Sequence, residues 1–240
     1  MKISKRTLFG ATAAALALFC APAQAHRVYP MSYELSPTGS GAATVLRVDN
    51  TTERPLTLEV SVEKRSWDER GNETRTPADE DFLILPPQMI VEPGKTQAIR
   101  VQYVGAPTLD QTAMYVVGVN QVPVADPSAG TGVQFVINFG TAAYVVPTGA
   151  KTELKIVSVA EASEPGKMEI VLENSGARYA PLGNTTWTFT NGAGQKMELS
   201  GDPLRETLVA AVVPSGGRRI FTVPAAEGFA LTAPIQLSIK

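Results

Sequence analysis

The chain has 240 residues, and its 21 lysine and arginine residues against 23 aspartate and glutamate residues give a net charge of −2. A weakly acidic chain without a basic cluster does not match a nucleic-acid-binding protein. The single cysteine and single histidine exclude a disulfide framework and clustered metal sites of cysteine and histidine.

The first 25 residues match the three parts of a secretory signal peptide. An apolar run from about residue 8 to 21 leads to a small-x-small cleavage site, and it follows a basic start formed by Lys2, Lys5 and Arg6. The run has about 14 residues, which is too short for a comfortable membrane span. We therefore expect cleavage after Ala25, export, no membrane insertion, and a mature chain that begins at His26 and has no cysteine.

Short alternating runs continue along the rest of the chain, and no segment keeps the 3.6-residue period of a helix. In the first half, the pattern predicts strands over residues 44–50, 56–62, 82–85, 96–103 and 114–119. In the second half, it predicts strands over residues 153–159, 168–173, 185–190, 196–199, 210–213, 219–223 and 235–239. Strands at this spacing indicate an all-β fold with two immunoglobulin-like β-sandwich domains in tandem, residues 26–147 and 148–240.

One strand, predicted over residues 132–147, stands at the junction of the two halves. Its alternate positions carry the bulky apolar side chains Val133, Phe135, Ile137 and Phe139, so one face is apolar along its length. Periodicity alone favours an ordinary sandwich strand with this face turned inward. The alternative hypothesis is that the strand lends its apolar face to another protein.

The segment 85–101 resembles the first-domain signature of PapD-like periplasmic pilus chaperones of the chaperone–usher pathway. Leu85-Pro86-Pro87 precedes a short strand, a Pro93-Gly94 turn and a strand that carries Arg100. The two prolines end ladder pairing at a sheet edge, and Pro-Gly suits a tight turn. The resemblance extends over nearly the whole mature chain. Besides this segment, it rests on the leader, the two-domain length, the strand that ends at a proline and an Asn-Ser element at 174–175.

The resemblance implies a periplasmic protein that binds, folds and caps pilus or fimbrial subunits and delivers them to an outer-membrane usher. Such chaperones insert the last strand of their first domain into the open groove of an incomplete subunit. The family's donor positions fall on Val133, Phe135 and Ile137, and Phe139 continues the row. Because an open strand edge invites pairing with a second copy, we expect the free protein to form a capping dimer or to keep this segment mobile.

The chain departs from the family in the basic pair that holds the C-terminal carboxylate of the subunit. The family's lysine position falls at about Ala142, and the first predicted strand, 28–35, contains no basic residue. Arg27 and Arg100 are the nearest replacements for a carboxylate anchor, although Arg100 is better interpreted as an ion-pair partner that steadies the two domains. This departure and the loop of about ten residues before the donor strand indicate a divergent, short-loop member.

Other candidate sites carry little chemistry. The acidic run 79–81 lacks the glycine-punctuated spacing of a calcium loop and is interpreted as a solvated turn. His26 alone does not supply a metal site, and we expect it to be disordered at the terminus. Without a histidine in the body of the fold, a hydrolytic triad is excluded, so we expect no enzyme, no metal and no cofactor. The alternative function is that of a two-domain structural or adhesive surface protein, such as a pilus component.

Overall fold

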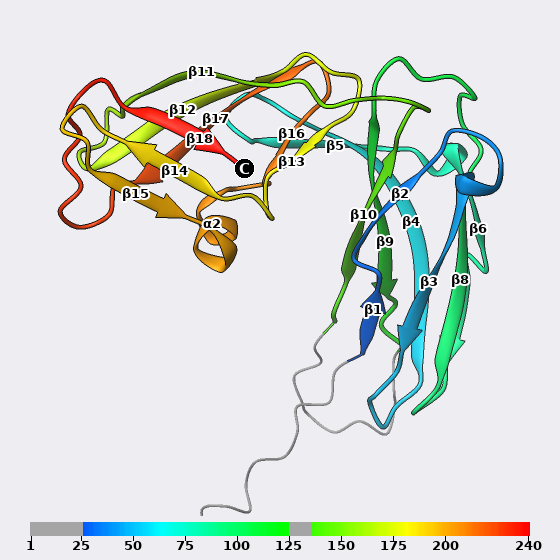
Figure 1. Ribbon diagram of the computed structural model, residues 1–240. Coiled ribbons are helices and arrows are strands. Elements are labelled where there is room, and N and C mark those ends of the chain that lie inside the picture. Colours follow the sequence, from blue (N-terminus) through cyan, green and yellow to red (C-terminus); the bar gives the residue numbers. More distant parts are fainter. Residues whose placement is uncertain (1–25, 125–135) are drawn as a thin grey trace, which may run out of the picture.

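The computed structural model describes residues 26–124 and 136–240, which form two β-sandwich domains set at an angle to each other (Figure 1). The first domain contains β1 to β10 and the second contains β11 to β18. The prediction of two tandem immunoglobulin-like sandwiches is confirmed. The expected signal peptide, residues 1–25, lies outside the described residues, and so do residues 125–135.

Two sheets face each other in the first domain. One has the order β1-β3-β8-β6 and is built from Arg27–Tyr29, Ala43–Asp49, Thr96–Tyr103 and Phe82–Leu85. The other has the order β2-β10-β9-β4-β5, built from Ser32–Leu35, Phe139–Val145, Ala113–Gln121, Leu56–Trp67 and Glu73–Pro77, and β7 (Gln88–Val91) also pairs with β4.

The core of the first domain forms where alternate side chains of the two sheets meet. On β8, Ile99 and Val101 are buried, whereas Ala98 and Arg100 are exposed, as the period of a strand requires. The central strand β9 differs, because four consecutive residues from Met114 to Val117 are buried. Both faces of β9 are therefore covered, one by its own sandwich and one by the second domain.

The second domain contains three small sheets around an aromatic core. Their orders are β11-β12-β17 (Leu154–Glu161, Lys167–Asn174, Gly217–Pro224), β15-β14-β18 (Lys196–Leu199, Trp187–Thr190, Gln236–Ile239) and β13-β16 (Ala180–Pro181, Val212–Val213). Trp187 packs edge-on against Phe221, with ring centroids 5.9 Å apart. The helix α2 (Gly201–Thr207) buries Leu204 in the same core.

The structure differs from the expected elements in four places. Within the described residues, the predicted strand 132–147 is a strand only over Phe139–Val145, which is β10. The predicted strand 28–35 is two strands, because the chain bends at Pro30 and passes from β3 in one sheet to β10 in the other. β5 does not follow from periodicity, because all five of its residues are exposed. α2 has seven residues, too few to show a helical period.

Candidate binding edge and inter-domain contact

The strand β10 has an open edge at its N-terminal end. It pairs with β9 along its whole length, from Phe139 to Val145. On its other side it pairs with β2 only from Ala142 to Val145, in parallel. Among the described residues, no strand pairs with 136–141 on the side away from β9. The backbone there is available to a strand from outside the domain.

The predicted donor positions lie in different surroundings. Val133 and Phe135 lie outside the described residues. Ile137 is 40% exposed, and its N–H donates to Gln121 Oε1 at 3.3 Å. Phe139 is half-buried and packs against the core of its own domain. Of the two described donor positions, Ile137 is therefore exposed to solvent, whereas Phe139 contacts the core of its own domain.

His26 packs at the start of this segment and is not a disordered terminal residue. It is 3% exposed, and its ring meets the Phe139 ring edge-on, with centroids 4.9 Å apart. Its Nε2 atom is buried without a hydrogen-bond partner. Desolvation lowers the pKa of His26, and a hydrogen bond to the Ile137 backbone opposes this effect in part. The sequence contains no signal for this contact, since it arises only when the chain start meets β10.

Because the pKa of His26 is lower in the folded protein than in the unfolded chain, protonation favours unfolding. The neutral imidazole therefore stabilises the fold above the unfolded pKa of about 6.5, and this contribution disappears as the pH falls through the folded pKa. We expect the Tm of the first domain to drop between pH 7.5 and pH 5, and His26→Gln to flatten this part of the profile. Equal pH dependence of Tm in the two proteins would show that His26 is not responsible.

The two domains pack together through a hydrophobic cluster beside the linker. Met114 and Val146 come from the first domain, and Tyr179 and Val212 come from the second. The rings of Tyr144 and Tyr179 stack across the boundary, with centroids 4.1 Å apart and an interplanar angle of 7°. Stacked aromatic rings add roughly 0.5–1.5 kcal/mol to the effect of burial alone.

An ion pair closes the same contact. Arg178 Nη2 donates to both carboxylate oxygens of Glu34, at 2.6 and 2.7 Å, and the Tyr179 hydroxyl donates to Glu34 at 2.7 Å. Desolvation and then the hydrogen bond to Glu34 raise the pKa of Tyr179, so its hydroxyl remains a donor. The backbone N–H of Thr112 also donates to the Ala177 carbonyl at 2.9 Å. The sequence does not reveal the ion pair between Arg178 and Glu34, because these two residues are 144 positions apart in the chain.

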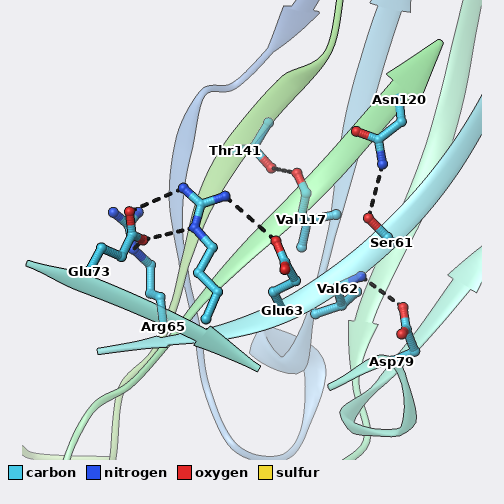
Figure 2. A network of polar contacts seen from close by, with 10 residues as sticks. Ser61, Val62, Glu63, Arg65, Glu73, Asp79, Val117, Asn120 and Thr141 are labelled. Atoms are coloured by element: carbon cyan, nitrogen blue, oxygen red, sulfur yellow. Dashed lines mark hydrogen bonds and ion pairs between the residues drawn. The ribbon is translucent and has the colours of Figure 1, made fainter. Parts of the chain in front are cut away.

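A charged network covers the outer face of β4 and β5. Figure 2 shows Arg65 on β4 next to Glu73 on β5, with Arg65 Nε 2.7 Å from Glu73 Oε1. Arg75 joins Glu73 and Glu63 at 3.1 and 3.5 Å. The Arg65 guanidinium also lies 4.2 Å from the centre of the Trp67 ring. Burial lowers the pKa of Arg65, and Glu73 opposes this effect. Each arginine in this network is thus already paired with a carboxylate.

The two suggested carboxylate anchors are each paired with a side chain of their own sheet. Arg27 on β1 pairs with Asp49 at 3.5 Å, and Arg100 on β8 donates to Gln102 at 3.0 Å. Both arginines lie in the four-stranded sheet, whereas β10 belongs to the other sheet. The ion pair expected between Arg100 and the second domain is formed instead by Arg178 and Glu34.

The acidic run 79–81 is part of the first domain's hydrogen bonding. Asp79 accepts from the Val62 N–H at 2.8 Å (Figure 2), and Asp81 accepts from the Tyr115 hydroxyl at 2.8 Å. Within 26–124 and 136–240, no three histidine, cysteine, aspartate or glutamate residues gather in a group that would hold a metal ion. No helix of the described chain has the length and apolar character needed to cross a membrane.

Comparison with known proteins agrees with this architecture. The model of the family described as pili and flagellar-assembly chaperone, PapD N-terminal domain, matches residues 35–151. No curated protein matches the chain.

Solved chaperone structures share the fold of both domains. The CsuC–CsuE chaperone–tip subunit pre-assembly complex from the archaic chaperone–usher Csu pili of Acinetobacter baumannii matches with a TM-score of 0.57 and 16% identity, over 90% of this chain and 97% of that chain. The class 5 fimbriae chaperone CfaA matches with a TM-score of 0.57 and 15% identity, over 90% and 99%. The chaperone YadV matches with a TM-score of 0.58 and 12% identity, over 89% and 91%.

Proposed function

We infer the function of this PapD-like chain from two findings: its first domain matches the family of pili and flagellar-assembly chaperones, PapD N-terminal domain, over residues 35–151, and both domains share the fold of solved fimbrial chaperones. From this premise we propose that the protein is a periplasmic, non-enzymatic chaperone of a chaperone–usher pathway. It binds pilus or fimbrial subunits, caps them and delivers them to an outer-membrane usher. Two of the solved proteins with this fold, CsuC and SafB, are seen in complexes with a tip subunit and a pilin, which supports a subunit as the partner.

The open edge of β10 is the observation that carries the proposal. At the N-terminal end of β10, residues 139–141 pair with β9 and with no other described strand, and residues 136–138 pair with none. A subunit whose own sandwich lacks a strand also has unpaired backbone groups, along the groove where that strand is missing. Pairing between the two satisfies backbone N–H and C=O groups on both proteins.

The apolar side chains of the donor segment supply the rest of the interaction. We propose that Val133, Phe135 and Ile137 enter the groove of the subunit, and that Phe139 forms the inner end of the row, where it is shared with the chaperone's own core. Each side chain stabilises the complex by roughly 1.5–3 kcal/mol when fully buried, before the costs of association are subtracted. The complex is then lasting but still able to release the subunit to a better-fitting strand.

Delivery to an usher requires a second surface that remains free while the subunit is bound. The outward face of the four-stranded sheet offers one, because Val45 and Leu85 flank Arg100 in a single cross-strand row and are 45% and 49% exposed. This sheet is not the one that contains β10. We propose this row as the usher contact.

A double substitution of Val45→Asp and Leu85→Asp tests this contact, since both side chains point away from the core. We expect the variant to retain its subunit in a pull-down but to lose binding to the usher, with at least a tenfold drop in assembled fibres. A matched control is Ala98→Asp, which places a charge elsewhere on the same sheet. Fibre assembly at the level of the unmodified protein in the double variant would exclude this surface.

Co-expression with the neighbouring gene products, followed by affinity purification, tests the proposed function itself. A chaperone co-elutes with one subunit at one-to-one stoichiometry and is absent from finished fibres. The alternative, a structural or adhesive pilus component, predicts its presence in the fibre. Sedimentation of the purified free protein tests the capping dimer, which predicts a mass that rises with concentration toward two chains. When a subunit is bound, the predicted mass is that of one chaperone plus one subunit at all concentrations.

A further inference from the structure

The hairpin formed by β4 and β5 reaches from the first domain to the second (Figure 1). Its tip, residues 68–72, lies against the sheet that ends in β17. The Ile220 N–H on β17 donates to the Glu69 carbonyl at 2.7 Å, and Arg70 lies 3.5 Å from Glu169 on β12. β17 is an outer strand of its sheet, so the hairpin tip covers part of a strand edge.

A buried arginine lies beneath the tip. Arg219 is 1% exposed, and its guanidinium donates to the carbonyls of Val209, Ala210 and Val212 at 2.8, 3.1 and 3.1 Å. Desolvation lowers the pKa of Arg219, and the nearby carboxylate of Asp68, on the tip, favours the charged form. The tip therefore supplies the negative charge that partly compensates a buried cation of the other domain.

The tip fits over Arg219 because residue 71 is a glycine. Gly71 has a φ of +92°, and a Cβ atom at this position would lie 2.7 Å from Arg219 Nη2. Asp68 closes the turn by accepting from the backbone and side-chain nitrogens of Asn72, at 2.9 and 2.6 Å. A larger residue at position 71 would push the tip away from the second domain.

Arg219 also connects the tip to the first inter-domain contact. The carbonyls that it holds belong to the loop that carries Val212, and Val212 is part of the hydrophobic cluster between the domains. Ala210 in this loop has a φ of +47°, a conformation that is costly for a residue with a side chain and that needs such fixation. The domains are thus joined at two separate places, the cluster beside the linker and the hairpin tip.

We infer that the β4–β5 hairpin is a strut that fixes the angle between the two domains, and that Arg219 is the positioning residue on which its tip rests. Two separated contacts prevent the rotation about the linker that one contact would permit. The consequence for binding rests on the proposed function: a fixed angle presents the donor strand and the second domain to a subunit as one preformed surface, which lowers the cost of ordering on association.

Two glycine substitutions distinguish the loss of the contact with Arg219 from the backbone strain that alanine causes at any positive φ. Gly71→Ala places a methyl group against Arg219, whereas Gly94→Ala adds the same methyl group at a φ of +69° with no atom within 4 Å. Because the only cysteine of the sequence is Cys20, in the expected leader, Ala98→Cys and Ala160→Cys give one spin-label site in each domain. Electron–electron distance measurement between the labels then reports the inter-domain angle.

We expect one narrow distance distribution for the otherwise unmodified protein and for Gly94→Ala, and a broad or shifted distribution for Gly71→Ala. Exchange of the Ile220 amide hydrogen should accelerate at least tenfold in Gly71→Ala only. If Gly71→Ala does not fold, Asp68→Ala replaces it, because this substitution opens the tip turn at the surface. A narrow, unshifted distribution together with unchanged Ile220 exchange in the folded variant would overturn the strut.

Subunit capture by the same variants is measured separately. The inference predicts weaker capture by Gly71→Ala than by Gly94→Ala, and equal capture despite a broadened angle contradicts the consequence for binding. If no variant, including the unmodified protein, captures a subunit, the proposed function fails. The distance measurement still decides whether the strut exists.

Discussion

Replacing Ile137 with aspartate is expected to abolish subunit capture while leaving the protein folded. Ile137 is 40% exposed in the free protein, so its removal costs the fold little. In the complex, the substitution loses roughly 1.5–3 kcal/mol of apolar burial and adds the cost of desolvating a carboxylate. Since 1.4 kcal/mol corresponds to a factor of about ten in Kd, we expect affinity to fall by at least a hundredfold. Pull-down of a co-expressed subunit and circular dichroism measure the two effects.

The neighbouring residue provides a matched control. Val136 is 43% exposed and is expected to point to the opposite side of the extended chain. Val136→Asp should therefore retain most subunit binding, and Phe135→Asp should behave like Ile137→Asp. If Ile137→Asp unfolds the free protein, this side chain belongs to the core of its own domain. If it folds and still captures the subunit, the row 133–139 is not the donor face.

Replacing Asn174 with alanine is expected to produce the largest loss of stability in the second domain. Asn174 is fully buried, and its side chain accepts from the N–H groups of Glu153 and Gly176 and donates to the carbonyl of Arg178. Alanine leaves these backbone groups without partners, at about 1–3 kcal/mol for each buried group. We expect a total loss of roughly 2–4 kcal/mol and a fall in Tm of roughly 10–20 °C, measured by calorimetry.

The loss should extend to the inter-domain contact, because Asn174 orders the loop that presents Arg178 to Glu34. Asn174→Asp keeps the two acceptor interactions but removes the donor and buries a carboxylate against carbonyl oxygens, so a loss at least as large as that of Asn174→Ala is expected. Asn50→Ala is the counterpart in the first domain, where Asn50 donates to the Val91 carbonyl at 2.8 Å. A Tm for Asn174→Ala within about 2 °C of the unmodified protein would contradict the hydrogen-bonding account.

The sequence predicts the architecture well because strand signals are local. The ranges 96–103 and 196–199 agree with the bounds of β8 and β15, since their alternating apolar residues form the two cores. The exposed β5 and the short α2 carry no such alternation and escape prediction. The division of the first strand at Pro30 depends on which sheet each half joins, and periodicity contains no information on sheet membership.

The contacts between the domains are less accessible to sequence reasoning. Glu34 and Arg178, or Gly71 and Arg219, are distant in sequence and are brought together only by the packing of the complete domains. The resemblance to PapD-like chaperones directs attention to Arg27 and Arg100, but these side chains pair with Asp49 and Gln102 on the four-stranded sheet. Their suggested role as carboxylate anchors remains a prediction.

Hydrogen exchange of the donor segment, measured with and without a bound subunit, tests most directly whether the open edge of β10 pairs with a strand of the subunit. If residues 132–141 complete the sandwich of another protein, those of their amides that do not bond to β9 become protected at least a hundredfold in the one-to-one complex, while the amides of β8 change little. A complex in which this segment exchanges as fast as in the free protein would show that the subunit binds elsewhere.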